Sequence, residues 1–145
     1  MSTTAIRKGK VAQVIGPVVD VEFFTEDLPA INSAIKIDDE AKGIHLTVEV
    51  AGHMGDRIVR AVAMSATQGL VRGMEAIDTG APISVPVGAT SLGRIFDLLG
   101  NPIDGKGPLD AKLRLPIHRQ SPAFEDQVPA TKQFETGLKS IDLLA

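Results

Sequence analysis

The residues with the clearest potential for chemistry lie in one glycine-rich stretch, GNPIDGKG, at Gly100–Gly107. Its first seven residues match G-x-x-x-x-G-K, the loop that binds nucleotide phosphates through backbone N–H groups and a lysine. That chemistry also needs a Ser or Thr after the lysine and a helix that follows the loop. Here Pro102 removes one N–H group, Gly107 replaces the Ser or Thr, and Pro108 opposes a helix. We interpret the stretch as two consecutive turns, with a phosphate site as the weaker alternative.

Histidine and cysteine chemistry has little support in this sequence. There is no cysteine, so disulfides and thiolate metal sites are excluded. His45, His53 and His118 are scattered and form no H-x-x-x-H pair. Apolar and polar residues alternate along the predicted strand that contains His45, so His45 is expected on the solvent face. His53 is expected in a turn. We predict no metal site.

Nucleophilic and acid–base catalysis also lack a signature. No G-x-S-x-G motif occurs, and the serines considered stand without a neighbouring base: Ser65, Ser84, Ser91, Ser121 and Ser140. The carboxylates of Asp38, Asp39 and Glu40 fit a solvated hairpin loop that ends at Gly43. We therefore assign no catalytic, cofactor-binding or metal-binding residue.

Composition limits the classes of protein that remain. The 145 residues are 43% hydrophobic and 23% charged, which suits one domain or a small domain with a connector. The net charge of −3 and the absence of a basic cluster larger than Arg7, Lys8 and Lys10 argue against nucleic acid as a partner. No apolar run approaches the roughly 18 residues of a membrane span, and the N-terminus lacks the apolar core of a secretory signal. Any membrane association is therefore expected to go through partners.

The first part of the chain has the pattern of short strands. After an arm at residues 1–8, Val19, Val21 and Phe23 alternate with acidic residues, and Leu46, Val48 and Val50 alternate in the same way. The Gly16–Pro17 break predicts either two short strands or one bent strand, and Gly52–Asp56 is expected to be a turn. About six strands over residues 9–81 fit a small barrel or a sandwich.

The rest of the chain, residues 82–145, reads as a connector. Pro82 and Pro86 restrict Ile83–Val87 to an extended form that is unsuited to a central strand. Gly93–Gly100 is expected to form one or two helical turns, and Arg114–Arg119 is extended at best. We expect the apolar side chains of the connector, Leu113, Leu115, Ile117 and Phe124, to be covered. Thr136–Ala145 has helical spacing and stops within an apolar run without a C-cap signal, so we expect the chain to continue.

Taken alone, these residues favour a structural or interaction module over an enzyme. Six phrases then add a resemblance that runs from Gly9 to Leu144. In order and spacing they resemble the N-terminal part of the catalytic β subunits of F-type ATP synthases: GKVAQVIGPVVDVEF, LTVEVAGHMGDRIVRAVAM, GLVRGMEAIDTGAPISVPVG, LGRIFDLLGNPIDGKGPL, LPIHRQSPAFEDQ and ETGLKSIDLL. The α subunits have a similar architecture, but IGPVVDVEF and GHMGDRIVRAVAM are more similar to β. Two departures, at Gly52–Met54 and Gln68, do not change this resemblance.

The resemblance implies a mainly β fold. Its parts are a six-stranded closed β-barrel at 9–81, an extended connector, and the first helix of an α/β nucleotide-binding domain that starts at 82–145. It implies a place in an alternating α3β3 ring with γ, and proton-driven ATP synthesis with Mg-ATP and ADP in the complete subunit. The family's phosphate loop would follow Ala145, so this segment is expected to be inactive alone and to bind no cofactor. The expected location is the cytoplasmic face of a bacterial membrane, ahead of a thylakoid or mitochondrial membrane. The alternative is a free-standing barrel module for binding or oligomerisation, and the coding sequence beyond Ala145 distinguishes the two.

Overall fold

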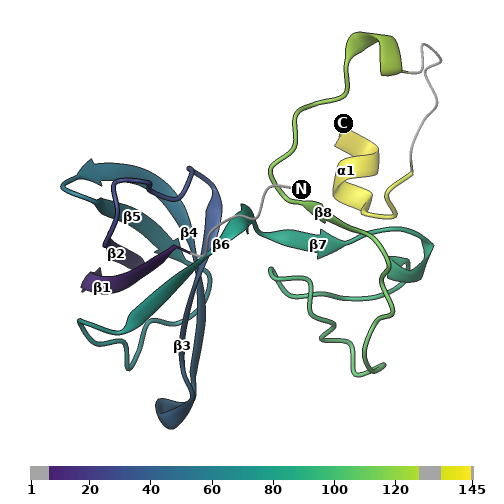
Figure 1. The fold of residues 1–145 in the computed structure, drawn as a ribbon. Coiled ribbons are helices and arrows are strands. Elements are labelled where there is room, and N and C mark those ends of the chain that lie inside the picture. The colour runs from purple at the N-terminus through teal and green to yellow at the C-terminus, as the bar shows by residue number, and fades with distance from the viewer. Residues whose placement is uncertain (1–6, 128–134, 145) are drawn as a thin grey trace.

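A six-stranded barrel forms the first part of the computed structural model, which describes residues 7–127 and 135–144. Its strands are β1 (Lys8–Ile15), β2 (Val18–Phe23), β3 (Ser33–Asp39), β4 (Ile44–Gly55), β5 (Ile58–Ala63) and β6 (Glu75–Pro82). Antiparallel pairing in the order β1-β2-β5-β4-β3-β6 closes the sheet on itself (Figure 1). The predicted mainly β fold with a closed six-stranded barrel is confirmed, and closure leaves no free sheet edge.

Alternating apolar side chains build the barrel core as the sequence predicted. Val19, Val21 and Phe23 of β2 are at most 1% exposed, and Leu46, Val48 and Val50 of β4 are at most 2% exposed. They belong to a single buried cluster to which all six strands contribute. The period of two residues places these side chains on one face of each strand, and closure turns that face inward.

Two of the expected connections have the expected form. Gly16 has a φ of 57° between β1 and β2, so the Gly16–Pro17 break separates two strands. The acidic stretch joins β3 to β4 through a 3₁₀ turn at Glu40–Lys42. The carboxylate of Asp39 accepts a hydrogen bond from the Lys42 N–H group at 3.2 Å, and Gly43 ends the turn in the left-handed conformation.

The predicted turn at Gly52–Asp56 is wrong. β4 continues to Gly55 and stays paired with β5 through irregularities between Val50 and Gly52 and between His53 and Gly55. The chain reverses only at Asp56 and Arg57, which both have positive φ. Gly52 and Gly55 flank the irregularities of this strand, and the ladder continues past Gly52 because a bulge absorbs one extra residue without ending the pairing.

The connector adds a two-stranded sheet of β7 (Ser84–Pro86) and β8 (Arg114–Pro116) beside the barrel (Figure 1). The extended forms predicted at Ile83–Val87 and Arg114–Arg119 are therefore present over Ser84–Pro86 and Arg114–Pro116. Further along are 3₁₀ turns at Ala89–Ser91 and Phe124–Asp126 and one helix, α1 (Lys139–Leu144). The predicted helix is confirmed over these six residues, and Ala145 lies outside the described residues.

Two expectations for the connector are wrong. Gly93–Gly100 contains no helical turn: Phe96 pairs with Pro102 in an isolated β-bridge, and residues 98 and 99 form a turn. Most of the apolar side chains expected to be covered are open to solvent, with Leu113 at 55%, Ile117 at 39% and Phe124 at 88% exposure. The barrel core lies within residues 11–76, so the connector contributes no buried side chain to it.

Candidate functional site

Gly100–Gly107 forms turns whose N–H groups face the chain's own carboxylates. Asp97 Oδ1 accepts hydrogen bonds from the N–H groups of Leu99 at 3.0 Å and Asn101 at 2.7 Å. Asp97 Oδ2 accepts a third from the side-chain amide of Asn101 at 2.9 Å. Burial raises the pKa of Asp97, but these hydrogen bonds outweigh burial and lower it on balance. This carboxylate occupies the backbone donors at the start of the glycine-rich stretch.

Asp104 does the same for the second half of the stretch. Its carboxylate pairs with the guanidinium of Arg94 and accepts a hydrogen bond from the Lys106 N–H group at 3.1 Å. The hydrogen bonds from Arg94 hold the pKa of Asp104 well below its ordinary 3.8. The Lys106 ammonium points to the carbonyl oxygen of Gly93 at 3.3 Å. A phosphate-binding loop leaves its N–H groups and its lysine to the ligand, whereas here protein oxygens accept from them. Of the two turns predicted within the stretch, only the second has a counterpart, a bend at residues 104–106, because Pro102 instead forms a β-bridge with Phe96.

The three histidines lie apart, and the ring of each one has a hydrogen-bond partner of its own. His45, which is exposed as expected, has Nδ1 at 3.1 Å from Asp38 Oδ1. His53 lies within β4 rather than in a turn, and its Nε2 is 2.8 Å from the carbonyl oxygen of Pro29. His118 Nε2 lies 2.9 Å from Glu49 Oε2 and so links the connector to the barrel. Within residues 7–127 and 135–144, no three His, Cys, Asp or Glu side chains gather as a metal ion would need.

The serines and the acidic hairpin have structural surroundings. Ser84 Oγ accepts a hydrogen bond from Arg114, and Ser91 Oγ donates one to the carbonyl oxygen of Gly88. Asp38 and Asp39 are engaged by His45 and Lys42. Ser65 lines a shallow hollow, and Ser121 and Ser140 are exposed. The prediction that the segment holds no catalytic, metal or cofactor residue stays a prediction.

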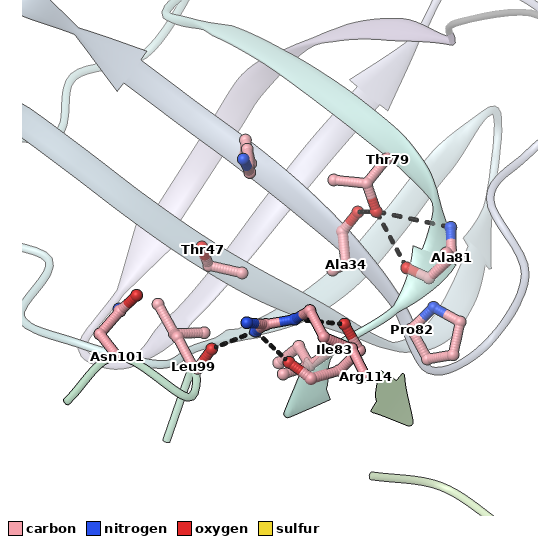
Figure 2. Close-up of a pocket in the computed structure, with 11 residues that line it drawn as sticks. Ala34, Thr47, Thr79, Ala81, Pro82, Ile83, Leu99, Asn101 and Arg114 are labelled. Carbon is pink, nitrogen blue, oxygen red and sulfur yellow. Dashed lines mark hydrogen bonds between the residues drawn. The ribbon is translucent and has the colours of Figure 1, made fainter. Parts of the chain in front are cut away.

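A hollow of about 450 Å³ lies where the connector crosses the outside of the barrel. We call it the junction hollow, and Figure 2 shows its lining. β3, β4, β6 and β7 contribute to its wall together with the turn around residues 99–101 and one residue of β8. Its polar and apolar landmarks are Lys36, Thr47, Ile83, Leu99, Asn101 and Arg114.

Arg114 holds this junction together. Its Nη2 donates to the carbonyl oxygens of Ser84 at 2.7 Å and Leu99 at 2.9 Å, bonds that appear as dashed lines beside Arg114 in Figure 2. Gly100 lies close to Pro86 and Arg114. The Cβ of any other residue at this position would be 2.4 Å from Pro86 Cδ and 3.1 Å from Arg114 Nη2. The connector backbone therefore passes Pro86 at a distance that only glycine permits, and it also lies close to Arg114.

Sequence reasoning did not single out the residues of the junction hollow. Lys36 and Thr47 are directly opposite each other in the β3–β4 ladder, on the outer face of the strands. Counting the register from the Asp39–Gly43 turn identifies this pair, since residues equidistant from a hairpin turn face each other. Arg114 carries no such signal, because its neighbours in the hollow come from strands far away in the sequence.

Two groups of ion pairs fix the barrel wall. Arg60 of β5 makes a bidentate pair with Asp20 of β2, at 2.8 and 2.9 Å, and its hydrogen bonds lower the pKa of Asp20 against the effect of burial. Arg7 reaches both Asp27 at 2.8 Å and the buried Asp78 at 3.0 Å. The ion pair between Arg7 and Asp78 connects the start of β1 to β6.

The barrel was compared with known protein families. Residues 11–80 match the model of the ATP synthase alpha/beta family, beta-barrel domain. The closed barrel is therefore similar to the β-barrel domain of that family. The match covers the interval from β1 to β6, so the family barrel and the closed barrel of the structure are the same unit.

The matched interval ends before the connector, so the glycine-rich stretch and most of the junction hollow lie outside the match. In the part of the chain that the structure describes, no helix has the length and hydrophobicity to cross a membrane.

Proposed function

We propose that the chain is the N-terminal part of the catalytic β subunit of an F-type ATP synthase, where it supplies the barrel that joins neighbouring subunits. The closed six-stranded barrel that matches the alpha/beta family carries this proposal. The assignment to β rather than α rests on the phrases IGPVVDVEF and GHMGDRIVRAVAM. The chemistry, ATP synthesis from ADP and phosphate driven by a proton gradient, belongs to the complete subunit with Mg-ATP.

The partners in this proposal are α subunits in an alternating α3β3 ring with γ, and the complex lies at the cytoplasmic face of a bacterial membrane. The barrel would meet its neighbours through its sides. Apolar side chains exposed on the outside support this role, among them Ile15, Phe24 and Val62 with exposures of 52%, 58% and 39%. Exposed apolar groups on a small domain are typical of surfaces that a partner covers.

Sedimentation velocity tests the proposal directly. The chain is mixed in one experiment with the purified α subunit of a bacterial F-type ATP synthase, and in another with the β subunit. A β-type barrel is expected to associate with α and not with β, because like subunits do not adjoin in the proposed ring. Association with β alone would show that the chain is of the α type, and association with neither would contradict the proposed interface.

A pair of variants locates the interface. Val62→Glu places a charge on the side of the barrel and is expected to weaken association with α. Ala41→Glu makes the same kind of change at the exposed tip of the β3–β4 hairpin and serves as the control. Equal losses in both variants would argue against contact through the sides.

A further inference from the structure

The junction hollow has an unusual charge balance. Two of the 11 residues that line it, Lys36 and Arg114, are cationic, and none is an aspartate or a glutamate. The two cations come from separate elements, β3 of the barrel and β8 of the connector. A partly enclosed space with two positive side chains and no acidic one is electrostatically suited to an anion.

Arg114 is held in place by neutral acceptors. Its guanidinium donates to two carbonyl oxygens and to Ser84 Oγ at 3.4 Å, so its orientation is fixed while its charge is not neutralised. No carboxylate lies within 4.0 Å of it among the residues placed in the structure, and its Nη1 has no hydrogen-bond partner there. A fixed guanidinium with a free edge is a typical ligand group for carboxylate and phosphate.

Lys36 and Thr47 supply the opposite wall. Across the described ranges of the chain, neither Lys36 Nζ nor Thr47 Oγ1 has a hydrogen-bond or ion-pair partner. The carboxylates nearest along the sheet and the adjoining turn are already engaged, Asp38 by His45 and Asp97 by the turn at Leu99–Asn101. One ammonium group and one hydroxyl group are thus available as donors on the barrel side.

The remaining wall is apolar. Ile83 is buried at 4% exposure, and Pro82 and Leu99 lie beside it in Figure 2. A mixture of two positive charges, one of them fixed, and an apolar wall is typical of small-molecule sites, in which polar groups orient the ligand and apolar groups cover it.

We propose that the junction hollow binds a small organic anion, a molecule that carries a carboxylate or a phosphate group on a short carbon body. The anionic group pairs with Arg114 and Lys36 and accepts from the hydroxyl of Thr47, while the carbon body lies against Ile83. Because the ligand touches both the barrel and the connector, its binding stabilises the junction between them.

Nuclear magnetic resonance titration of the full chain tests this site. Succinate and inorganic phosphate are the two probes, added separately at constant pH and ionic strength, and the amide signals of Thr47 and Asn101 are followed. The expected result is saturable shifts at these residues with at least one probe. Saturation by succinate assigns the carboxylate as the recognised group, and saturation by phosphate assigns the phosphate.

Matched lysine variants decide whether the charge in the hollow is responsible. Lys36→Met is expected to weaken binding by about tenfold or more, because one charge-assisted contact is lost. Lys112→Met removes the same charge from an exposed position of the connector and is expected to leave binding unchanged. Equal weakening in both variants, or shifts that do not saturate with either probe, would overturn the proposal.

A second variant guards against a folding artefact. Arg114→Gln is expected to abolish saturation, but Arg114 also fastens the connector to Ser84 and Leu99. Lys36 is exposed on β3, so its substitution leaves these bonds intact. Unchanged signals of core residues such as Val48 confirm that the barrel of each variant is folded, and tight binding by folded Lys36→Met would refute the site.

Discussion

Asp104 keeps its charge because Arg94 and a backbone N–H group donate to it. Its pKa in the folded chain is depressed, so its contribution to stability is fully present above the unfolded value near 3.8 and is lost as the pH falls through the folded value. In Arg94→Met the largest cause of the depression is removed. We expect the pKa of Asp104 to rise toward 3.8 in that variant, as measured by carboxyl ¹³C resonances against pH.

Arg119→Met is the control for this titration, because Arg119 is exposed in the connector and, within the described residues, makes no hydrogen bond or ion pair with Asp104. The titration of Asp104 should be the same in Arg119→Met and in the parent chain. If the pKa of Asp104 stays depressed in Arg94→Met, the backbone N–H groups of the turn, rather than the guanidinium, are what stabilise the ionised carboxylate.

Lys106 allows a second prediction at this scale. Its ammonium is directed to the carbonyl oxygen of Gly93, and the neighbouring N–H groups face Asp97 and Asp104. We expect calorimetric titration of the chain with Mg-ATP to show no saturable heat, with the same result for Lys106→Ala. Saturable binding that is lost in Lys106→Ala but kept in Lys112→Ala would prove that the stretch is a phosphate site.

Among the elements, the short β7–β8 sheet depends on a glycine. Gly100 has a φ of 77° and packs against Pro86 Cδ, whereas Gly105 has a similar φ of 71° and open space around it. Ala at either position adopts an unfavourable conformation that costs about 1–2 kcal/mol. At Gly100 the methyl group also collides with Pro86, so we expect Gly100→Ala to destabilise the sheet by about 1–3 kcal/mol more than Gly105→Ala.

Amide hydrogen exchange measures this difference at Val87, whose N–H group donates to the carbonyl oxygen of Leu113 at 3.1 Å. Faster exchange in Gly100→Ala than in Gly105→Ala is the expected outcome. Exchange accelerated equally by both substitutions would mean that backbone conformation alone matters and that the contact with Pro86 does not.

Strands were predictable from the sequence where one face is buried, and other features were not. The alternation of Val19, Val21 and Phe23 predicted β2 correctly because burial of one face imposes a period of two. The glycines at Gly52 and Gly55 misled the prediction because bulges use the same residue as turns. The segment from Gly93 to Gly100 was misread as helical because Asp97 captures backbone donors through a contact that no periodicity reveals.

For the candidate site, the limit was distance along the chain. The hairpin register relates Lys36 to Thr47, but Arg114 joins them only through the path of the connector over the barrel. Local patterns specify which face of a strand a residue occupies, and they do not specify which later segment crosses it. The argument against a phosphate loop at Gly100–Gly107 needed no long-range information, because its grounds, Pro102 and Gly107, are local.

For the whole molecule, the division of the core predicts which part folds by itself. Every buried residue of the core cluster lies within residues 11–76. A chain of residues 7–82 therefore retains the complete core, and we expect it to give a β-type circular dichroism spectrum and a cooperative unfolding transition. Residues 83–145 are expected to show neither, because their large apolar side chains are mostly exposed.

Each fragment is compared with the full chain at the same temperature and denaturant concentration. A midpoint of residues 7–82 close to the first transition of the full chain would match the expectation. An unfolded 7–82 fragment would mean that the connector, through contacts such as His118 with Glu49, is needed for the barrel to form.

The chain enters the barrel at Lys8 and leaves it at Pro82, and β1 and β6 run antiparallel beside each other. The two crossing points are therefore at one end of the same ladder, where Arg7 is bound to Asp78. Tension applied between the arm and the connector acts on that ladder from one end, so its hydrogen bonds bear the force one after another. The ion pair between Arg7 and Asp78 is then the contact nearest the arm, and a pull on the connector also loads the β3–β6 pairing, because Pro82 is paired with Ser33.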